Sequence, residues 1–407
     1  VCPKAYALLD LQEDARRLRG PVRRVGDRFE PIGWNDALDL VAGRLLALRA
    51  RDGAPAIAAY LGNPIVHSLG LMTHVRQVMG LLRTPNVFSA TTVDQVAHHV
   101  AAQALYGHQL LVPVPDVDRT QHLLVLGANP LASNGSLMTA PGIGRRLKDL
   151  RRRGGRLVVI DPRRTETAAA ADAHHYIRPG TDVYLLLALL QVLFAEGRAE
   201  PGRLRPFLAD WDALPPLVAA YTPESVAAAT GIAPALIRGI AREFAQAPAA
   251  ACYGRMGVST QAYGGLCQWL VQLLNIATGN LDRAGGTLFP LPAVDLVGQK
   301  RSGAGSPGRS RSRVSGRPSF GGEFPAALMA EEIETPGTGR IRGLLVVAGN
   351  PVSSTPNGRR LERALGDLEF MVALDYRVTA TSRHACLILP ATTPLERDHY
   401  DFAFQAF

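Results

Sequence analysis

The order of apolar and polar residues along the chain predicts strands that alternate with helices. Short apolar runs at 56–60 and 123–126 each have a glycine close behind and a helical stretch after it. Between 141 and 153 apolar residues recur at helical spacing, and Gly154-Gly155 is a helix stop signal. The apolar run 157–160 then predicts a buried strand. Together these elements form a βαβ unit, which predicts a doubly wound α/β fold with a parallel sheet and helices on both faces.

Two other stretches of the sequence predict a core helix and a long surface loop. The longest apolar run, 185–195, is interrupted by Gln191 and has about half the length of a bilayer span, so it predicts a core helix. Residues 298–321 are rich in Gly, Ser and Arg and predict a long surface loop. At roughly 100–200 residues per domain, the 407 residues predict two or three domains.

An internal repeat is the most informative feature of the sequence. Three predicted strands end in nearly the same turn, which contains Asn63-Pro64, Asn129-Pro130 or Asn350-Pro351. After the second and third turns, the next strand ends in the pattern Asp-x-Arg-x-Thr-x-Thr, which starts at Asp161 and Asp375. A third shared pattern, Ile-x-Pro-x-Thr, follows in both copies. Three motifs in the same order predict two α/β units of similar build.

The repeat lies where such folds bind ligands. In a doubly wound sheet, ligands lie outside the carboxyl ends of the strands, and the turn after the first strand lets the backbone approach a pyrophosphate. Gly127 allows that approach, Asn129 supplies an amide and Pro130 makes the exit rigid. Asp161 stands where an acid accepts a ribose hydroxyl. The alternative interpretation is ordinary turns with capping Asp and Thr, but two copies in register favour two dinucleotide-type sites.

A nicotinamide-dependent dehydrogenase is a competing hypothesis. Its Gly-x-Gly-x-x-Gly motif is absent after these strands, because Gly142-Ile143-Gly144 follows Pro141 and Leu147 replaces the third glycine. The chain also lacks the Gly-x4-Gly-Lys-Ser/Thr loop of phosphoryl transfer. A second glycine-rich stretch, 253–261, joins an apolar run to a predicted helix, and such a stretch is more often a turn than a cofactor site.

The charge of the chain indicates which classes of partner it can bind, and its cysteine content indicates whether disulfides hold the fold. The net charge is +9, and nearly all basic residues are arginine, which grips phosphate with two parallel hydrogen bonds. A compositional bias towards arginine is the alternative. The basic residues are dispersed apart from 151–153 and 299–317, without interleaved aromatic residues, so nucleic acid is disfavoured. The four cysteines have no paired spacing, which disfavours a disulfide framework.

Further segments extend in a fixed order from Cys2 to about Glu396. They are Cys2-Pro3-Lys4, 17–21, 33–37, 127–130, 160–165, 178–182, 254–257 with Thr260-Gln261, 278–280 and 349–351. In this order they resemble the molybdopterin oxidoreductases of the dimethyl sulfoxide reductase and formate dehydrogenase superfamily. The resemblance implies two pseudo-equivalent dinucleotide-binding domains after a small N-terminal iron–sulfur-type segment. Their cofactor is a bis(molybdopterin guanine dinucleotide) complex of molybdenum or tungsten.

The resemblance also assigns residues to the cofactor. Residues implied for one dinucleotide are Gly127, Asn129, Pro130, Asp161, Arg163, Thr165, Gly180 and Asp182. Residues implied for the other are Asn350, Pro351, Ser354, Asp375, Arg377 and Thr379. Met256, Gly257 and Thr260 are implied to approach a pterin.

The N-terminus resembles the end of an iron–sulfur motif. Cys2 matches its last cysteine, and Lys4 matches a lysine that relays electrons between the cluster and the pterin. A [4Fe–4S] cluster needs four thiolates, so the others are expected before Val1. The β-barrel domain that ends relatives is also absent, so we expect the chain to be part of a longer protein.

One departure concerns the metal. In relatives, a stretch resembling 86–104 carries the side chain that ligates molybdenum, and aligning on Val93-Asp94 puts Val100 there. Val100 cannot ligate a metal, and Ala101 stands where formate-oxidising relatives have a histidine. The neighbouring His98 and His99 are candidate catalytic residues, with packed or surface histidines as the alternative interpretation.

The sequence thus predicts the catalytic chain of a formate dehydrogenase-like oxidoreductase with an unassigned substrate. Two-electron chemistry at molybdenum or tungsten would pass electrons through the [4Fe–4S] cluster to an electron-transfer partner protein or domain. A scaffold homologue that lost the metal and the nicotinamide enzyme remain alternatives. The expected partners include a small-molecule substrate but neither nucleic acid nor a membrane span, and a family prior favours the cytoplasm.

The predicted domain organisation follows the repeat. Residues 1–50 are expected to be the remnant of the iron–sulfur domain. Residues 51–95 with 336–407 form the first cofactor-binding domain, and 96–290 form the second. Residues 291–335 are expected to be a connecting loop.

Overall fold

The structure is a computed structural model that describes residues 3–292, 294–300 and 303–400. The chain divides into two compact units. Unit 1 is built from Gln95–Ala304, and unit 2 from Lys4–Asp94 together with the segment that starts at Gly305. Each unit is described by itself.

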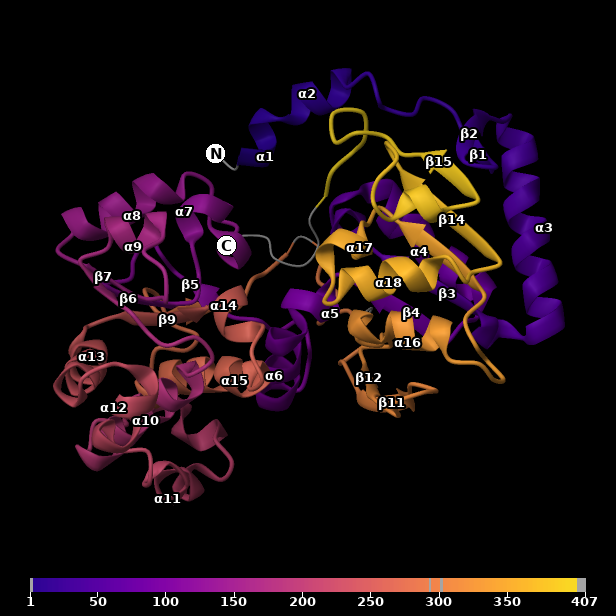
Figure 1. Ribbon diagram of the computed structural model, residues 1–407. Helices are drawn as coiled ribbons and strands as arrows, with labels where there is room; N and C mark the ends of the chain where they lie inside the picture. The colour runs from indigo at the N-terminus through magenta and orange to yellow at the C-terminus, as the bar shows by residue number, and fades with distance from the viewer. Residues whose placement is uncertain (1–2, 293, 301–302, 401–407) are drawn as a thin grey trace. The chain divides into compact units, whose positions relative to one another are not determined.

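Unit 1 contains a parallel sheet of four strands (Figure 1). Their order is β8 (Ala173–His175), β7 (Arg156–Ile160), β6 (His122–Leu126) and β9 (Ala250–Gly254). Strands β7, β6 and β9 are mostly apolar runs because both faces of the sheet are covered there, whereas the edge strand β8 has the sequence Ala-His-His and is half-buried.

Two hydrophobic layers enclose this sheet. Alternate residues such as Leu123 and Leu157 pack with α8 (Ile143–Arg152). Their neighbours Leu124 and Val158 pack on the opposite face. The helices of that face are α10 (Asp182–Ala195), α13 (Pro234–Gln246) and α15 (Gly264–Ala277). Shorter elements of unit 1 include α6 (Val96–Tyr106), β5 (Val114–Pro115), α7 (Pro130–Ser133), α9 (Glu166–Ala170), α11 (Leu214–Val218), α12 (Pro223–Thr230), α14 (Met256–Ser259) and β10 (Thr287–Leu288).

Unit 2 contains a sheet of seven strands. In order they are β2 (Arg28–Pro31), β1 (Val22–Val25), β15 (Leu387–Pro390), β14 (Phe370–Asp375), β13 (Gly343–Val347), β3 (Ile57–Leu61) and β4 (Asn86–Ser89). Strands β15 to β4 are parallel, whereas β1 is antiparallel to both of its neighbours.

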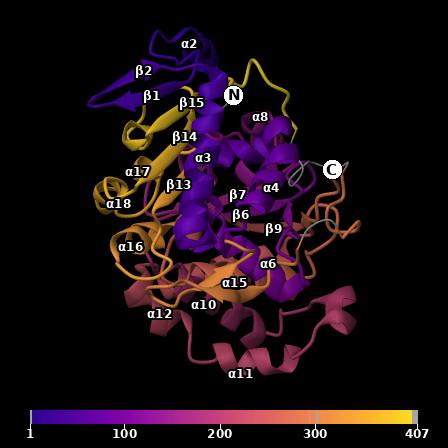
Figure 2. The ribbon, with the colours of Figure 1, turned by 90° about the vertical axis from the view of Figure 1, so that its right-hand side faces the viewer.

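Helices cover both faces of the second sheet as well. Helices α3 (Trp34–Asp52) and α4 (Leu69–Leu82) pack on the face that contains Leu345 and Val372. Helices α16 (Met329–Glu334) and α18 (Gly358–Leu365) pack on the other face, and Figure 2 shows α3 and α18 on opposite sides of β13 and β14. Shorter elements are α1 (Pro3–Tyr6) at the start of the chain, α2 (Leu8–Glu13), α5 (Thr91–Asp94), β11 (Pro307–Arg311), β12 (Pro318–Phe320) and α17 (Pro351–Ser354).

The two sheets share one topology, which confirms the predicted fold class. The order β15-β14-β13-β3 in unit 2 repeats the order β8-β7-β6-β9 in unit 1. Asp161 directly follows β7, and Asp375 is the last residue of β14, so the two repeated acids occupy equivalent strand ends. The helices of the described part of the chain are all too short or too polar to cross a bilayer.

The structure corrects the predicted organisation at two places. Residues 1–50 do not form a separate remnant, because the described part adds β1, β2 and α3 to unit 2, with Val22 and Ala37 buried there. Residues 291–335 are not only a loop, since they contain α16 and the β11–β12 hairpin. The hairpin lacks an apolar pattern because β11 is exposed along its whole length. Its buried residues include Ser319 in β12 and Ser312 in the connection, where the Arg317 N–H donates to Ser312 Oγ (2.9 Å).

Candidate functional site

Two glycines bring the carboxyl ends of β6 and β9 into backbone contact. Gly127 has φ +54°, and a Cβ built on it would lie 2.8 Å from the Cα of Gly257. A Cβ on Gly257 would lie 2.7 Å from the Cα of Gly127, and the Gly257 N–H donates to the Gly127 carbonyl (2.9 Å). A larger residue at either position would separate the turns. The two glycines therefore form a backbone floor at this edge of the sheet, with Gly257 exposed and Gly127 half-buried.

A second connection joins the turns after β6 and β7. The Asn129 Oδ1 accepts hydrogen bonds from the Thr167 Oγ1 (2.8 Å) and the Thr167 N–H (3.2 Å). The Thr167 hydroxyl oxygen in turn accepts from the Leu131 N–H (3.1 Å). The Asn129 Nδ2 donates to Glu166, which lowers the pKa of that carboxyl. We call the Asn129–Thr167 pair the unit 1 clamp. It holds the predicted residue Asn129 in the protein's own hydrogen bonds.

Unit 2 contains the same clamp. The Thr381 Oγ1 donates to the Asn350 Oδ1 (2.7 Å) and accepts from the Val352 N–H (3.0 Å). Pro351 is buried at the first position of α17, as Pro130 is at the start of α7. The last threonine of each Asp-x-Arg-x-Thr-x-Thr pattern is thus explained by this clamp, although Thr167 and Thr381 were not predicted as site residues.

Two predicted carboxylates converge beside the glycine floor of unit 1. Asp182 is buried at the start of α10, and its Oδ2 accepts from the Gln261 Nε2 (2.6 Å). The same Nε2 donates to the Gly257 carbonyl (2.6 Å). Burial raises the pKa of Asp182, and the nearby charge of Asp161 raises it further. Asp161 is also buried, and its Oδ1 accepts from the Arg163 N–H (2.8 Å). This paired acid site favours a ligand that donates hydrogen bonds.

The other predicted residues of unit 1 divide into exposed and structural ones. Arg163, Gly180, Met256 and Thr260 are exposed. Thr165 is buried, and its hydroxyl accepts from the Ala168 N–H (3.1 Å) as the N-cap of α9. Thr165 therefore has the helix-capping role that the alternative interpretation of the repeat expects. Gln261, which the prediction of site residues omitted, is the residue that joins the acid site to the floor.

Unit 2 contains a polar cavity of about 680 Å³ at the carboxyl end of β14. Of the predicted residues, Asn350, Arg377 and Thr379 line it. Residues not predicted for this site also line it, and they are Arg16, Ser353, Val378, Ala380 and Arg383. We call this cavity the arginine pocket.

The arginine pocket has an excess of positive charge. Arg16 pairs with Asp14 (2.9 Å), and Arg377 lies 3.7 Å from the same carboxylate. The hydrogen bonds from Arg16 hold the pKa of Asp14 at about 2, so this carboxylate stays charged. Arg383 pairs with Glu362. Three guanidinium groups thus face two paired carboxylates, and an anionic ligand would balance the remainder.

Two other predicted residues of unit 2, Asp375 and Ser354, form hydrogen bonds next to the arginine pocket without lining it. The Asp375 Oδ2 accepts from the Thr379 Oγ1 (3.0 Å), and its Oδ1 accepts from the Tyr376 N–H (2.9 Å). Burial raises the pKa of Asp375. Ser354 does not line the pocket, and its hydroxyl donates to the Asn350 carbonyl (3.0 Å).

The predicted catalytic residues His98 and His99 are packed inside unit 1, as the alternative interpretation expects. Both side chains are buried, at 5% and 6% exposure. The His98 Nε2 lies 3.1 Å from the Gly254 carbonyl, and the His98 Nδ1 lies 3.4 Å from the Ser259 Oγ. The His99 Nδ1 lies 2.7 Å from the Gln109 carbonyl. Burial lowers the pKa of His98 to about 3 and also lowers that of His99. Burial favours the neutral rings, whose nitrogens contact groups outside α6.

The predicted cluster ligand Cys2 and the predicted electron relay Lys4 lie at the start of the chain. Cys2 lies outside the described residues, and of Lys4 only the backbone, in α1, is described. Cys252 and Cys267 are buried, which raises the pKa of both thiols, and Cys386 is half-buried. Within residues 3–292, 294–300 and 303–400, His, Cys, Asp and Glu side chains form no group of three that is placed to hold a metal ion.

The chain is similar to proteins of known activity along almost its entire length. It is 28% identical to formate dehydrogenase H of Escherichia coli, covering 97% of this chain and 57% of that protein. It is 27% identical to the arsenate respiratory reductase molybdopterin-containing subunit ArrA of a Shewanella species, covering 96% and 50%. The chain thus spans about half the length of these relatives.

A solved structure and a family model agree with this similarity. Acetylene hydratase from Pelobacter acetylenicus has a similar fold, with a TM-score of 0.78 at 22% identity over 96% of this chain and 57% of that one. The family model for molybdopterin oxidoreductase matches residues 17–403. On this match the chain belongs to the molybdopterin oxidoreductase family.

Proposed function

We propose that this chain binds a bis(molybdopterin guanine dinucleotide) complex and forms the core of a two-electron oxidoreductase. The observation that supports this most is the duplicated site. Two sheets of one topology each end in an Asn–Thr clamp, and each clamp adjoins polar groups suited to one half of a dinucleotide. Fold similarity alone does not give a function, so the proposal depends on these groups.

The residues of the two units fit the two halves of such a cofactor. In unit 1, a Cβ on Gly127 or Gly257 would meet the backbone of the other glycine and separate the two turns, so glycine at both positions keeps together the backbone floor that we propose a pterin or pyrophosphate approaches. Asp161 and Asp182 accept hydrogen bonds, which suits the hydroxyl and amino donors of a guanosine. In unit 2, Arg377 and the other pocket arginines suit the charge of a pyrophosphate.

When bound, the cofactor supplies the metal and its redox chemistry. The chain's own residues bind and orient it. We propose that α6 supplies no ligand to the metal, since Val100 occupies the resembling position and both histidines are committed to packing. The three described cysteines are dispersed and do not provide the four thiolates of a [4Fe–4S] cluster.

For the substrate and the redox partner we propose only a general class, because the relatives differ in their substrates. The relatives act on formate and on arsenate by name, and one is called a subunit. We propose a small-molecule substrate and an electron-transfer partner protein for the complete protein, with the formate-type reaction as one candidate. A homologue that keeps the fold without the metal is the second candidate, because α6 presents Val100 where relatives have a ligand.

The test compares Asp182→Asn and Asp375→Asn in the full-length protein. Each change removes a charged acceptor but keeps the side chain's shape. Loss of a ligand hydrogen bond of about 1–3 kcal/mol should weaken cofactor binding roughly 5- to 150-fold. Molybdenum and released guanine nucleotide are measured on each variant, with the melting temperature of its cofactor-free form. Asp212→Asn is the control, since the Asp212 side chain is 86% exposed in unit 1.

The outcomes separate binding from structure. Reduced molybdenum with an unchanged melting temperature in both site variants supports the proposal. Unchanged molybdenum and nucleotide with a lowered melting temperature would show that both carboxylates only stabilise their turns. Nucleotide without molybdenum in the wild type would favour the candidate that has lost the metal.

A further inference from the structure

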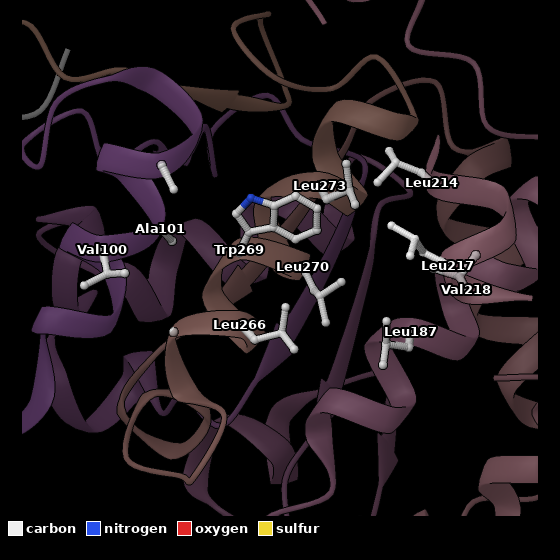
Figure 3. A pocket seen from close by; sticks show the side chains of 12 residues that line it. Val100, Ala101, Leu187, Leu214, Leu217, Val218, Leu266, Trp269, Leu270 and Leu273 are labelled. Atoms are coloured by element: carbon white, nitrogen blue, oxygen red, sulfur yellow. The ribbon is translucent and has the colours of Figure 1, made fainter. Parts of the chain in front are cut away.

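A second cavity, distinct from the arginine pocket, lies within unit 1. It has a volume of about 490 Å³ and lies between α6, α10, α11 and α15. Figure 3 shows Trp269, Leu266 and Leu270 on one side, with Leu214, Leu217 and Val218 opposite. All twelve residues that line it are apolar or glycine. Their side chains contribute one polar hydrogen, the indole N–H of Trp269.

Large apolar side chains on this cavity are open to solvent. Leu217 is 68% exposed, Leu266 is 43% exposed and Val100 is 39% exposed. A folded chain gains free energy when it buries such side chains, so a concave group of exposed ones is typical of a binding site. The volume also falls within the range of roughly 300–1,000 Å³ that small-molecule sites occupy.

The cavity adjoins the segment proposed to approach the pterin. Met256 and Gly257 belong to α14, which packs against both α6 and α15. A Cβ on Gly264 would lie 1.9 Å from the Ser259 carbonyl oxygen, so glycine is needed for α15 to start directly behind α14. The next residues, Gly265 and Leu266, already form the cavity wall. The absence of a side chain at Gly265 leaves space beside Val100, whose Cγ1 would lie 4.0 Å from a Cβ at that position.

The lining decides which chemistry suits the cavity. A small anion such as formate or nitrate would give up its hydration here without gaining a cation, and a single indole N–H would be its only donor. An uncharged apolar molecule has no hydrated charge to give up on entry, and it buries both its own surface and that of the exposed leucines.

We propose that this cavity binds the apolar body of the substrate, a small uncharged organic molecule with an aromatic or branched aliphatic skeleton. The assignment as a substrate site rests on the proposed function, whereas binding to the cavity does not require the metal. As a substrate site, the cavity would favour uncharged apolar substrates of the oxidoreductase over small anions such as formate or nitrate.

The test measures binding of the probe 4-fluorotoluene to the full-length protein as purified. Ligand-observed ¹⁹F NMR reports the binding. Saturable binding is expected. Ala104→Trp fills the cavity from an exposed position of α6 and should weaken binding at least about tenfold. Leu217→Ser removes one apolar wall and should weaken it roughly 3- to 10-fold. Phe207→Ser is the matched control, because Phe207 is 85% exposed in the same unit but does not line the cavity.

Three results would overturn the proposal. They are no saturable binding to the wild type, equal binding to a folded Ala104→Trp variant, and displacement of the probe by formate or nitrate. If Ala104→Trp does not fold, Leu217→Ser decides, because its exposed side chain can be truncated without opening the core. Molybdenum and guanine nucleotide are measured on the same samples. Normal cofactor content without probe binding refutes only the cavity, and probe binding without cofactor refutes only the proposed function.

Discussion

The Asn–Thr clamps allow a quantitative test of the repeat. Thr167→Val keeps the shape of the side chain but removes the hydroxyl that bonds Asn129 and Leu131. Thr167 is completely buried, so water cannot replace the lost partner. A buried amide left without an acceptor costs about 1–3 kcal/mol, so we expect the free energy of unfolding to fall by about 2 kcal/mol. Thr381→Val should cost at least as much in unit 2, since the Asn350 Oδ1 loses the Thr381 hydroxyl donor, whereas in the unit 1 variant the Asn129 Oδ1 keeps the Thr167 N–H as a donor.

Urea unfolding of the cofactor-free protein measures this effect. With an m-value of roughly 2 kcal/mol/M, the midpoint should shift by about 1 M. Intrinsic fluorescence can be assigned to a unit, because Trp34 lies in unit 2 whereas Trp211 and Trp269 lie in unit 1. Trp34→Phe therefore gives a background that reports on unit 1 alone. The control is Thr73→Val, whose exposed hydroxyl bonds carbonyls of its own helix. A loss below about 0.5 kcal/mol in either clamp variant would refute the reasoning.

Three further predictions follow from other contacts. Burial lowers the pKa of His98 to about 3 and that of His122 to about 4. The unfolded chain therefore binds more protons below pH 6.5, so stability should be complete above pH 7 and fall by about 2.5 kcal/mol per histidine at pH 4.5, as measured by urea unfolding at both pH values. Gly257→Ala should lower cofactor content and the melting temperature, because its Cβ meets the backbone of Gly127, whereas Gly239→Ala on α13 has open space and should not destabilise. Arg377→Gln should weaken GMP binding, measured by calorimetry, by about 3- to 10-fold and make it less salt-dependent, and an equal loss with Arg28→Gln, outside the pocket, would contradict this.

Much of the fold could be predicted because its signals are local. The strand at 157–160 and the helix before it follow directly from apolar spacing and from Gly154-Gly155, and the structure has β7 and α8 there. The repeat predicted the equivalent strand ends of Asp161 and Asp375. The β11–β12 hairpin could not be predicted in this way, because hydrogen bonds of buried serines hold it and no apolar alternation marks it.

The site was predictable only where its residues belong to the motifs. Arg16 reaches the arginine pocket from a segment far from Arg377 in sequence, so only the fold brings the two together. In the sequence, nothing distinguishes Gln261 from other polar residues near a glycine-rich turn. Only the structure shows that its side chain donates to Asp182. His98 shows the opposite failure, since its residue type indicates chemistry whereas its burial makes it a packing residue.

The order of the strands in unit 2 has a consequence for synthesis of the chain. Strand β3 pairs with β4, which follows it closely, and with β13, which is made only after residues 95–304 of unit 1. Until β13 emerges from the ribosome, one apolar edge of β3 has no partner, and such edges pair readily with other chains. Residues 95–304 of unit 1 form one continuous segment, which can fold during this interval. Chaperone demand on this protein should therefore concentrate on residues 57–89, which contain the first parallel strands to be made and wait for β13 before β3 is enclosed.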